Sequence, residues 1–169
     1  CFALVTTITD NSLSNLDNRR IARGETAIMP GKKLSPELNK ALRTATKPLN
    51  TKKGDLLFRA GEQARGAFVV KSGKVRLQLE GAGGLYPTRT LGPGSVIGLP
   101  ATVSGEPYSL TAEAMQDCEL DFISRKNLLA LLQHNTTAAL QILKILSEEI
   151  YQMRDTAKKA LPEKYETLQ

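Results

Sequence analysis

Between residues 49 and 124 the chain consists of short apolar runs that alternate with glycine-containing turns. Such runs are too short for helices and have the length of β-strands. The runs are Leu56-Leu57-Phe58, Ala67-Phe68-Val69-Val70, Val75-Arg76-Leu77-Gln78-Leu79 and Leu120-Asp121-Phe122-Ile123. The third alternates apolar and polar residues, as a strand with one buried face does. Turns at Ser72-Gly73, which suits a hairpin, and at Gly92-Pro93-Gly94 complete the pattern of a sandwich, jelly roll or barrel.

Helical patterns flank the strand region on both sides. Ser35 is a favourable N-cap, and apolar residues follow it at helical spacing, which predicts a short helix that Pro48 ends. After the strands, a short amphipathic helix is predicted at 125–133. A long helix is predicted at 136–159, with Asn135 as its cap.

The long helix carries a clear heptad pattern. Six apolar residues recur at alternating intervals of four and three, the spacing of a helix that pairs along a seam. These seam residues are Ala139, Leu143, Leu146, Ile150, Met153 and Ala157. A second apolar face holds Leu140, Ile142 and Ile145, and we expect it to dock on the β-body while the seam pairs with a second copy. The alternative is a core helix that is buried on both faces of a monomer.

The positive charge is concentrated at the N-terminal end. Residues 1–53 hold ten Lys and Arg against four Asp and Glu, whereas residues 54–169 hold thirteen of each, so the first segment accounts for the net charge of +6. A basic arm is able to contact nucleic acid or anionic lipid. The polar, aperiodic composition of residues 1–34 favours a flexible, solvated lead-in.

Neither a metal site nor a membrane segment is indicated. Cys1 and Cys118 are far apart and His134 is the single histidine, so the chain lacks a metal-ligand spacing. Cys118 lies in an apolar stretch and is expected to be buried. No apolar run approaches the roughly 20 residues of a membrane helix, and we expect a cytoplasmic protein without membrane contact.

One ordered series of residues runs through the strands and turns. It consists of Gly54-Asp55, Phe58, Gly61-Glu62, Phe68-Val69-Val70, Gly73-Lys74-Val75, Leu91-Gly92-Pro93-Gly94, Ile97-Gly98, Cys118-Glu119-Leu120 and Ile123-Ser124. The series resembles the cyclic-nucleotide-binding domain of CRP/FNR-type bacterial regulators. The resemblance implies a mainly β fold with helices, namely a double-stranded β-helix or jelly-roll β-roll, then a short helix and a long C-terminal dimerisation helix. The expected parts are a flexible basic segment at 1–34, the roll with short flanking helices at 35–134, the dimerisation helix at 135–160 and a tail at 161–169.

The resemblance implies a phosphate-binding cassette from Gly98 to Thr111. In the family, a Gly-Glu pair opens a short helix and an Arg followed by a small hydroxyl residue comes later. The Glu binds the ribose hydroxyl and the Arg pairs with the cyclic phosphate. Here Gly98 and Ser109 match, but Leu99 stands in the place of the Glu and Tyr108 in the place of the Arg. Because a buried phosphate without a cationic partner is strongly unfavourable, we expect no bound cyclic nucleotide and no cofactor.

The cassette is better suited to an apolar or weakly polar ligand, or to none. The family's base-contacting position on the long helix falls near Met153, with Arg154 beside it. The candidate pocket residues are Gly98, Leu99, Pro100, Ala101, Tyr108, Ser109, Leu110, Thr111, Met153 and Arg154. Glu106 or Arg89 would be able to supply a missing charge from a shifted loop, but the sequence places neither.

Three functions are therefore open. The first is a homodimeric CRP/FNR-like effector domain that senses an unidentified small molecule or transmits the state of a protein partner. The second is a true cyclic-AMP or cyclic-GMP module with a remodelled cassette, and the third is a ligand-free adaptor whose pocket is filled by Leu99 and Tyr108.

Other functions lack the residues they need. An iron–sulfur cluster requires more cysteines, and a haem requires better axial ligands than His134 and Cys118. The sequence shows no nucleophile–base pair for an enzyme. Since no helix-turn-helix fits after Lys159, we expect no specific DNA binding by this chain.

Overall fold

The computed structural model describes residues 34–79 and 89–160, the last five by their backbone alone, and these residues form eight strands and four helices. In chain order these are α2 (Pro36–Arg43), β1 (Lys47–Thr51), β2 (Leu56–Phe58), β3 (Gly66–Ser72), β4 (Val75–Gln78), β5 (Arg89–Leu91), β6 (Val96–Ile97), α3 (Leu99–Ser104), β7 (Thr111–Ala114), β8 (Cys118–Ser124), α4 (Arg125–His134) and α5 (Thr136–Ala160). Nearly all of the predicted segment 1–34 and the whole predicted tail 161–169 lie outside the described residues.

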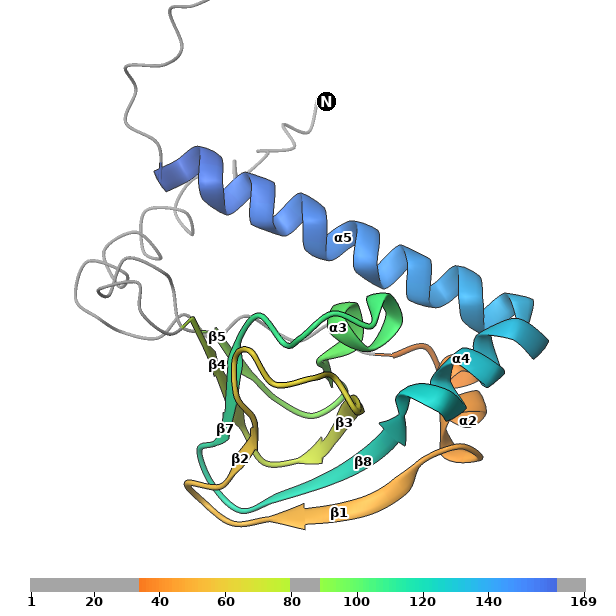
Figure 1. Ribbon diagram of the computed structural model, residues 1–169, viewed down its shortest axis with the longest axis horizontal. Coiled ribbons are helices and arrows are strands. Elements are labelled where there is room, and N and C mark those ends of the chain that lie inside the picture. The colour runs from red at the N-terminus through yellow and green to blue at the C-terminus, as the bar shows by residue number, and fades with distance from the viewer. Residues whose placement is uncertain (1–33, 80–88, 161–169) are drawn as a thin grey trace, which may run out of the picture.

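The strands form two antiparallel sheets of four strands each, in the orders β1-β8-β3-β6 and β2-β7-β4-β5. Figure 1 shows the strands gathered into one body, with α2 and α4 at one end and α5 running across it above α3. This arrangement confirms the predicted jelly-roll fold followed by a short helix and a long helix. No described helix has the length and apolar character that crossing a membrane requires.

The turn at Ser72-Gly73 connects the two sheets. β3 belongs to the first sheet and β4 to the second, so the expectation of a hairpin at this turn is wrong. Gly73 has a φ of +95°, and a Cβ there would overlap the Sγ atom of Cys118. A glycine is required because the chain changes sheets in a left-handed conformation against a neighbouring strand.

β3 is buried on both faces and separates two apolar cores. Phe68 and Val70 belong to the inner core between the sheets, whereas Ala67 and Val69 belong to the outer core beneath the helices. Every described helix contributes buried residues to the outer core. These residues are Leu38, Leu42, Leu99, Leu128, Ala138 and Ile142. The outer face of the first sheet is therefore the platform on which the helices are held.

Side-chain caps fix where the helices begin. Ser35 Oγ accepts a hydrogen bond from the amide three residues later at 3.2 Å, and Asn135 Oδ1 does the same for α5 at 2.9 Å, as predicted. α2 ends at Arg43, earlier than the expected stop at Pro48. Pro48 lies instead in β1, an edge strand, where a residue without an N–H group is tolerated.

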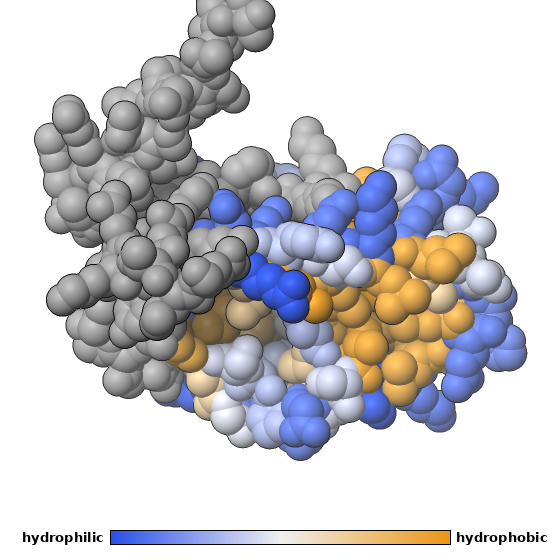
Figure 2. Space-filling model, turned by 90° about the horizontal axis from the view of Figure 1, so that it is seen from above, coloured by the Kyte–Doolittle hydropathy of each residue, from blue (hydrophilic) through white to orange (hydrophobic). Residues whose placement is uncertain are grey.

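α5 docks along one face and leaves another apolar face exposed. Ala138 and Ile142 are buried and Ile145 is partly buried in the outer core. Leu140 is 62% exposed, so its predicted grouping with Ile142 and Ile145 is wrong: it lies about 200° around the helix from Ile142. The exposed large apolar residues of α5 are Leu140, Leu143, Ile150, Tyr151 and Met153. Seen from above, the side on which α5 lies carries a broad hydrophobic surface (Figure 2).

Gly66 provides a test of the close packing at the start of β3. A Cβ at this position would overlap the carbonyl oxygen of Ile123 and lie 2.6 Å from the ring of Phe122. We expect Gly66→Ala to lower the free energy of unfolding by at least about 2 kcal/mol, measured by denaturant titration. Gly92→Ala is the matched control, because a Cβ there meets no atom within 4 Å. Equal stability of the two variants would contradict the packing described here.

Candidate ligand-binding cassette

The cassette begins with a short helix between two glycines. Gly98 and Gly105 have φ values of +76° and +83°, and they bound the six residues of α3. Within the helix, Thr102 is fully buried and its hydroxyl donates to the carbonyl oxygen of Gly98 at 2.7 Å. Thr102 was not among the predicted site residues, although it closes the turn that starts the cassette.

Tyr108, which was predicted to stand in place of an arginine, is held inside the protein. Its side chain is 4% exposed, and its hydroxyl donates to the carbonyl oxygen of Gly66 at 2.5 Å. The amide of Gly66 in turn donates to the same hydroxyl at 3.2 Å. The ring stacks on Phe58 with centroids 3.7 Å apart, and a Cβ on Gly98 would lie 2.9 Å from it. The phenol thus makes its hydrogen bonds to the chain itself.

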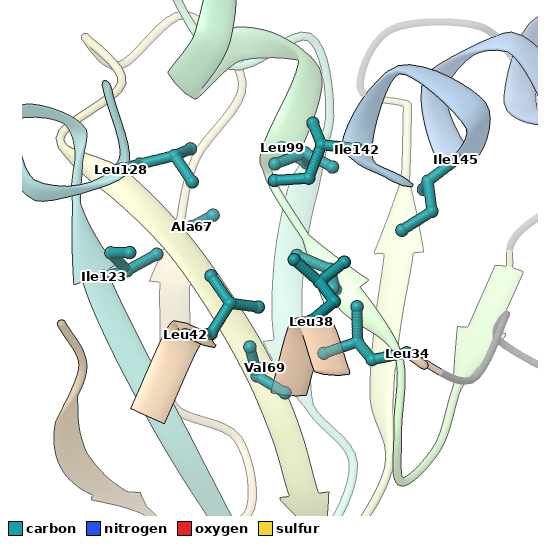
Figure 3. A pocket seen from close by; sticks show the side chains of 11 residues that line it. Leu34, Leu38, Leu42, Ala67, Val69, Leu99, Ile123, Leu128, Ile142 and Ile145 are labelled. Carbon is teal, nitrogen blue, oxygen red and sulfur yellow. The ribbon is translucent and has the colours of Figure 1, made fainter. Parts of the chain in front are cut away.

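Leu99, which was predicted to stand in place of a glutamate, belongs to a different core from Tyr108. It is 2% exposed and belongs to the outer core, while Tyr108 belongs to the inner core. Figure 3 shows Leu99 beside Ile142 of α5, among side chains from α2, α4 and β3. About 10 Å³ of free space remains between them, roughly enough for one water molecule. Leu99 therefore connects the cassette to α5 and does not face the inside of the roll.

The other predicted cassette residues are spread over different surroundings. Thr111 is buried, and its Oγ1 accepts a hydrogen bond from the amide of Ala60 at 2.9 Å. Ala101 packs against the inner core, Leu110 is half-buried, and Ser109 and Pro100 are exposed. These residues shape the loop, and the structure does not bring their side chains together around one cavity.

The predicted contributions of α5 lie apart from the cassette. Met153 is 66% exposed, and Arg154 is also exposed. Glu106 is exposed as well, and its backbone amide donates to Ser104 Oγ at 3.2 Å. Neither Arg154 nor Glu106 takes the place of the missing charged groups.

Arg89 lies on the inward side of β5 and reaches α5. It pairs with Leu77 across the strands and alternates with Leu91, which is in the inner core. Its Nη2 atom donates to Gln152 Oε1 at 3.3 Å, and its Nε atom is buried without a hydrogen-bond partner among the described residues. Burial raises the pKa of the Glu149 carboxyl above its ordinary value, and the nearby Arg89 guanidinium opposes part of that shift. The polar side chains of Arg89, Glu149 and Gln152 thus lie between the second sheet and α5.

Residues 34–79 and 89–160 contain no cluster of His, Cys, Asp and Glu that could hold a metal ion. Cys118 is buried, as predicted, and its thiol donates to the carbonyl oxygen of Gln116 at 3.1 Å.

The raised pKa of Glu149 makes stability depend on pH. The folded state retains the proton at pH values where the unfolded chain, with an ordinary value of 4.5, has released it. The free energy of unfolding should therefore fall as the pH rises through the window above 4.5. We expect Glu149→Gln to remove this decline, measured by urea unfolding at a series of pH values. Glu119→Gln, at an exposed position of β8, should keep the profile of the unchanged protein. Parallel profiles for all three proteins would exclude the role assigned to Glu149.

Solved structures share this fold and several are regulators. The catabolite activator protein of Thermus thermophilus is 26% identical with a TM-score of 0.64, over 74% of this chain and 59% of that one. The sensor domain of the transcriptional regulator DNR from Pseudomonas aeruginosa is 28% identical with a TM-score of 0.55, over 70% of this chain and 85% of that one. The N-terminal domain of a transcriptional regulator from Streptomyces coelicolor, 24% identical with a TM-score of 0.58 over 72% of this chain and 88% of that one, shares the fold.

The sequence itself matches a family model. No curated protein sequence gives a significant match. The chain spans 59% of the length of the Thermus protein. The model of the cyclic nucleotide-binding domain matches residues 48–135, from β1 to the cap of α5, which is more than half of the chain. The two-sheet roll, the short cassette helix and the long α5 agree with that match, and the chain belongs to the cyclic nucleotide-binding domain family as it occurs in CRP/FNR-type regulators.

Proposed function

We propose that this chain is the effector-sensing module of a CRP/FNR-type regulator whose cassette does not hold a cyclic nucleotide phosphate. The observation that carries the proposal is the state of Tyr108, which is buried and hydrogen-bonded to both polar groups of Gly66. Residues 98–111 contain no Lys, Arg or His. An anionic ring bound at this loop would lose water without gaining a cationic partner there.

Arg89 does not supply a cationic partner for a ligand at the cassette loop. Its guanidinium is engaged with Gln152 and lies near Glu149, so α5 and not the cassette loop provides its partners. A ligand that paired with Arg89 would have to replace these contacts. This arrangement favours an apolar or weakly polar effector, or the state of a protein partner, as the signal.

The signal would reach α5 through Leu99. This residue begins α3 and packs in the outer core with Ile142. Because the outer core is closely packed, a shift of α3 would change how α5 sits on the roll.

The exposed seam of α5 supports pairing with a second copy of the chain. Leu143, Ile150 and Met153 are 58%, 52% and 66% exposed, while Leu146 is partly buried at the edge of the outer core. An apolar heptad stripe on an exposed helix is the surface that a parallel partner helix covers. Two copies of α5 would bring the two rolls into one regulatory unit.

The names of the similar structures, a catabolite activator protein and the sensor domain of a transcriptional regulator, support a role in the control of transcription. We propose that this role is cytoplasmic and without catalysis. Because the chain spans only part of the Thermus protein, we place the output in another domain or in a protein partner.

The cassette proposal is tested by isothermal titration with cyclic AMP and cyclic GMP. We expect no saturable heat at nucleotide concentrations up to about 1 mM, because the missing Arg and Glu contacts weaken binding by orders of magnitude. Native mass spectrometry of the purified protein should show whether another small molecule is retained. A micromolar dissociation constant for either nucleotide would favour a true cyclic-nucleotide module with a remodelled cassette.

The pairing proposal is tested by sedimentation velocity. We expect the unchanged protein to be a dimer at micromolar concentration and the double variant Leu143→Asp/Ile150→Asp to be a monomer. Tyr151→Asp is the matched control, because Tyr151 is 71% exposed and lies on α5 outside the heptad seam. A monomeric unchanged protein, or a control that dissociates as the double variant does, would refute pairing through this seam.

A further inference from the structure

A groove opens at the mouth of the roll, between β1, β2 and β8. Its volume is about 460 Å³, within the range of small-molecule sites. In Figure 1 the strands β1 and β8 lie on the side of the roll away from α5. We call it the roll-mouth groove and define it by its floor, Phe58, Phe68, Tyr108 and Phe122, and its charged rim, Lys47, Glu62 and Arg65.

The floor is built on four aromatic rings, each in contact with the next. Tyr108 stacks on Phe58 at 3.7 Å, Phe58 contacts Phe68 at 5.9 Å, and Phe68 contacts Phe122 at 5.0 Å between ring centroids. Three of the chain's four phenylalanines are in this floor, although aromatic residues make up only 5% of the sequence. Phe58, Phe68 and Tyr108 are nearly buried while Phe122 is half-buried, so the floor is rigid beneath and accessible at one end.

The rim carries an excess of positive charge. Lys47, Glu62 and Arg65 are all exposed at the groove, which gives two cations against one carboxylate. None of these three side chains forms an ion pair with another described residue. The backbone of Arg65 is fixed, because its carbonyl oxygen accepts a hydrogen bond from the amide of Arg125 at 2.8 Å. Among the described residues, Lys47 and Arg65 therefore have no anionic partner at the edge of this floor.

We propose that the roll-mouth groove binds an aromatic monoanion of the aryl carboxylate or aryl sulfonate class. The ring system of the ligand packs on the aromatic floor, and its anionic group lies between Lys47 and Arg65. A second negative charge on the ligand would face Glu62, which restricts the class to single anions. The site lies on a different side of the roll from the polar side chains of Arg89, Glu149 and Gln152.

Tyr108 belongs both to this floor and to the cassette. A ligand in the groove contacts the ring whose hydroxyl fixes the cassette loop to Gly66. The proposed site does not depend on pairing through α5 or on the absence of a cyclic nucleotide.

The test uses anilinonaphthalene sulfonate, an aromatic monoanion whose fluorescence rises in apolar sites. We expect saturable binding at one site, and we expect Lys47→Glu/Arg65→Glu to raise the dissociation constant about tenfold. The control Lys53→Glu/Lys126→Glu alters two exposed lysines outside the groove and changes the net charge by the same amount. It should leave the affinity unchanged at physiological salt, where charges beyond about 8 Å are screened.

A reporter in the groove locates the probe. The chain has no tryptophan, so Leu49→Trp introduces a single indole at an exposed lining position. We expect energy transfer from this indole to the bound probe. Binding should also persist in Leu143→Asp/Ile150→Asp, which removes the seam of α5. The proposal is overturned if the rim pair and its control behave alike, if energy transfer is absent, or if binding is lost with the seam.

Discussion

The hydroxyl of Tyr108 holds the cassette loop to the roll through two hydrogen bonds with the backbone of Gly66. Tyr108 donates to the carbonyl oxygen of Gly66 and accepts from its amide, so both polar groups of that peptide position are satisfied by the side chain. Gly66 begins β3, and the absence of a side chain there lets β3 lie directly against Ile123 and Phe122 of β8. The position of the cassette loop is thus set by the same close contact that aligns the central strands of the first sheet.

In the function proposed above, this contact sets what the cassette recognises. The arginine that the family resemblance implies would be a cation facing a ligand, whereas the buried phenol of Tyr108 makes its hydrogen bonds within the chain. In the same proposal, Leu99 of the outer core stands where the family resemblance implies a side chain that binds a ribose. α3 lies between two left-handed glycines, while Leu99 packs in the outer core and Tyr108 in the inner core.

Much of the fold was readable from the sequence because its main signals are periodic. The long helix was predicted with both its start and its cap, and the strands β2, β3, β4 and β8 were recognised from their apolar runs. β1, β5, β6 and β7 were not recognised, because β6 has only two residues, β1 and β5 are mostly polar, and β7 alternates alanine with polar residues. Tertiary pairing, and not local pattern, makes these segments strands.

Less of the candidate site than of the fold could be predicted from the sequence. The substitutions at Leu99 and Tyr108 were visible, but a helix of six residues has no periodicity to show which core each side chain enters. Arg89 had a usable signal, since it is two residues from the inward-facing Leu91, but that signal depends on recognising β5 as a strand. The aromatic floor was not readable, because Phe58, Phe68, Tyr108 and Phe122 come from separate parts of the chain and meet only in the folded roll.

The strand order also governs how the chain comes to fold during synthesis. β1, the first strand, pairs along its whole length with β8, the last. The first sheet therefore lacks one of its two central strands until Cys118–Ser124 has emerged from the ribosome, and β3 has no long partner before then. At about 5–20 residues per second, this leaves the apolar faces of the early strands uncovered for several seconds. A nascent chain of this topology has more need of chaperone protection than one whose neighbouring strands pair in sequence.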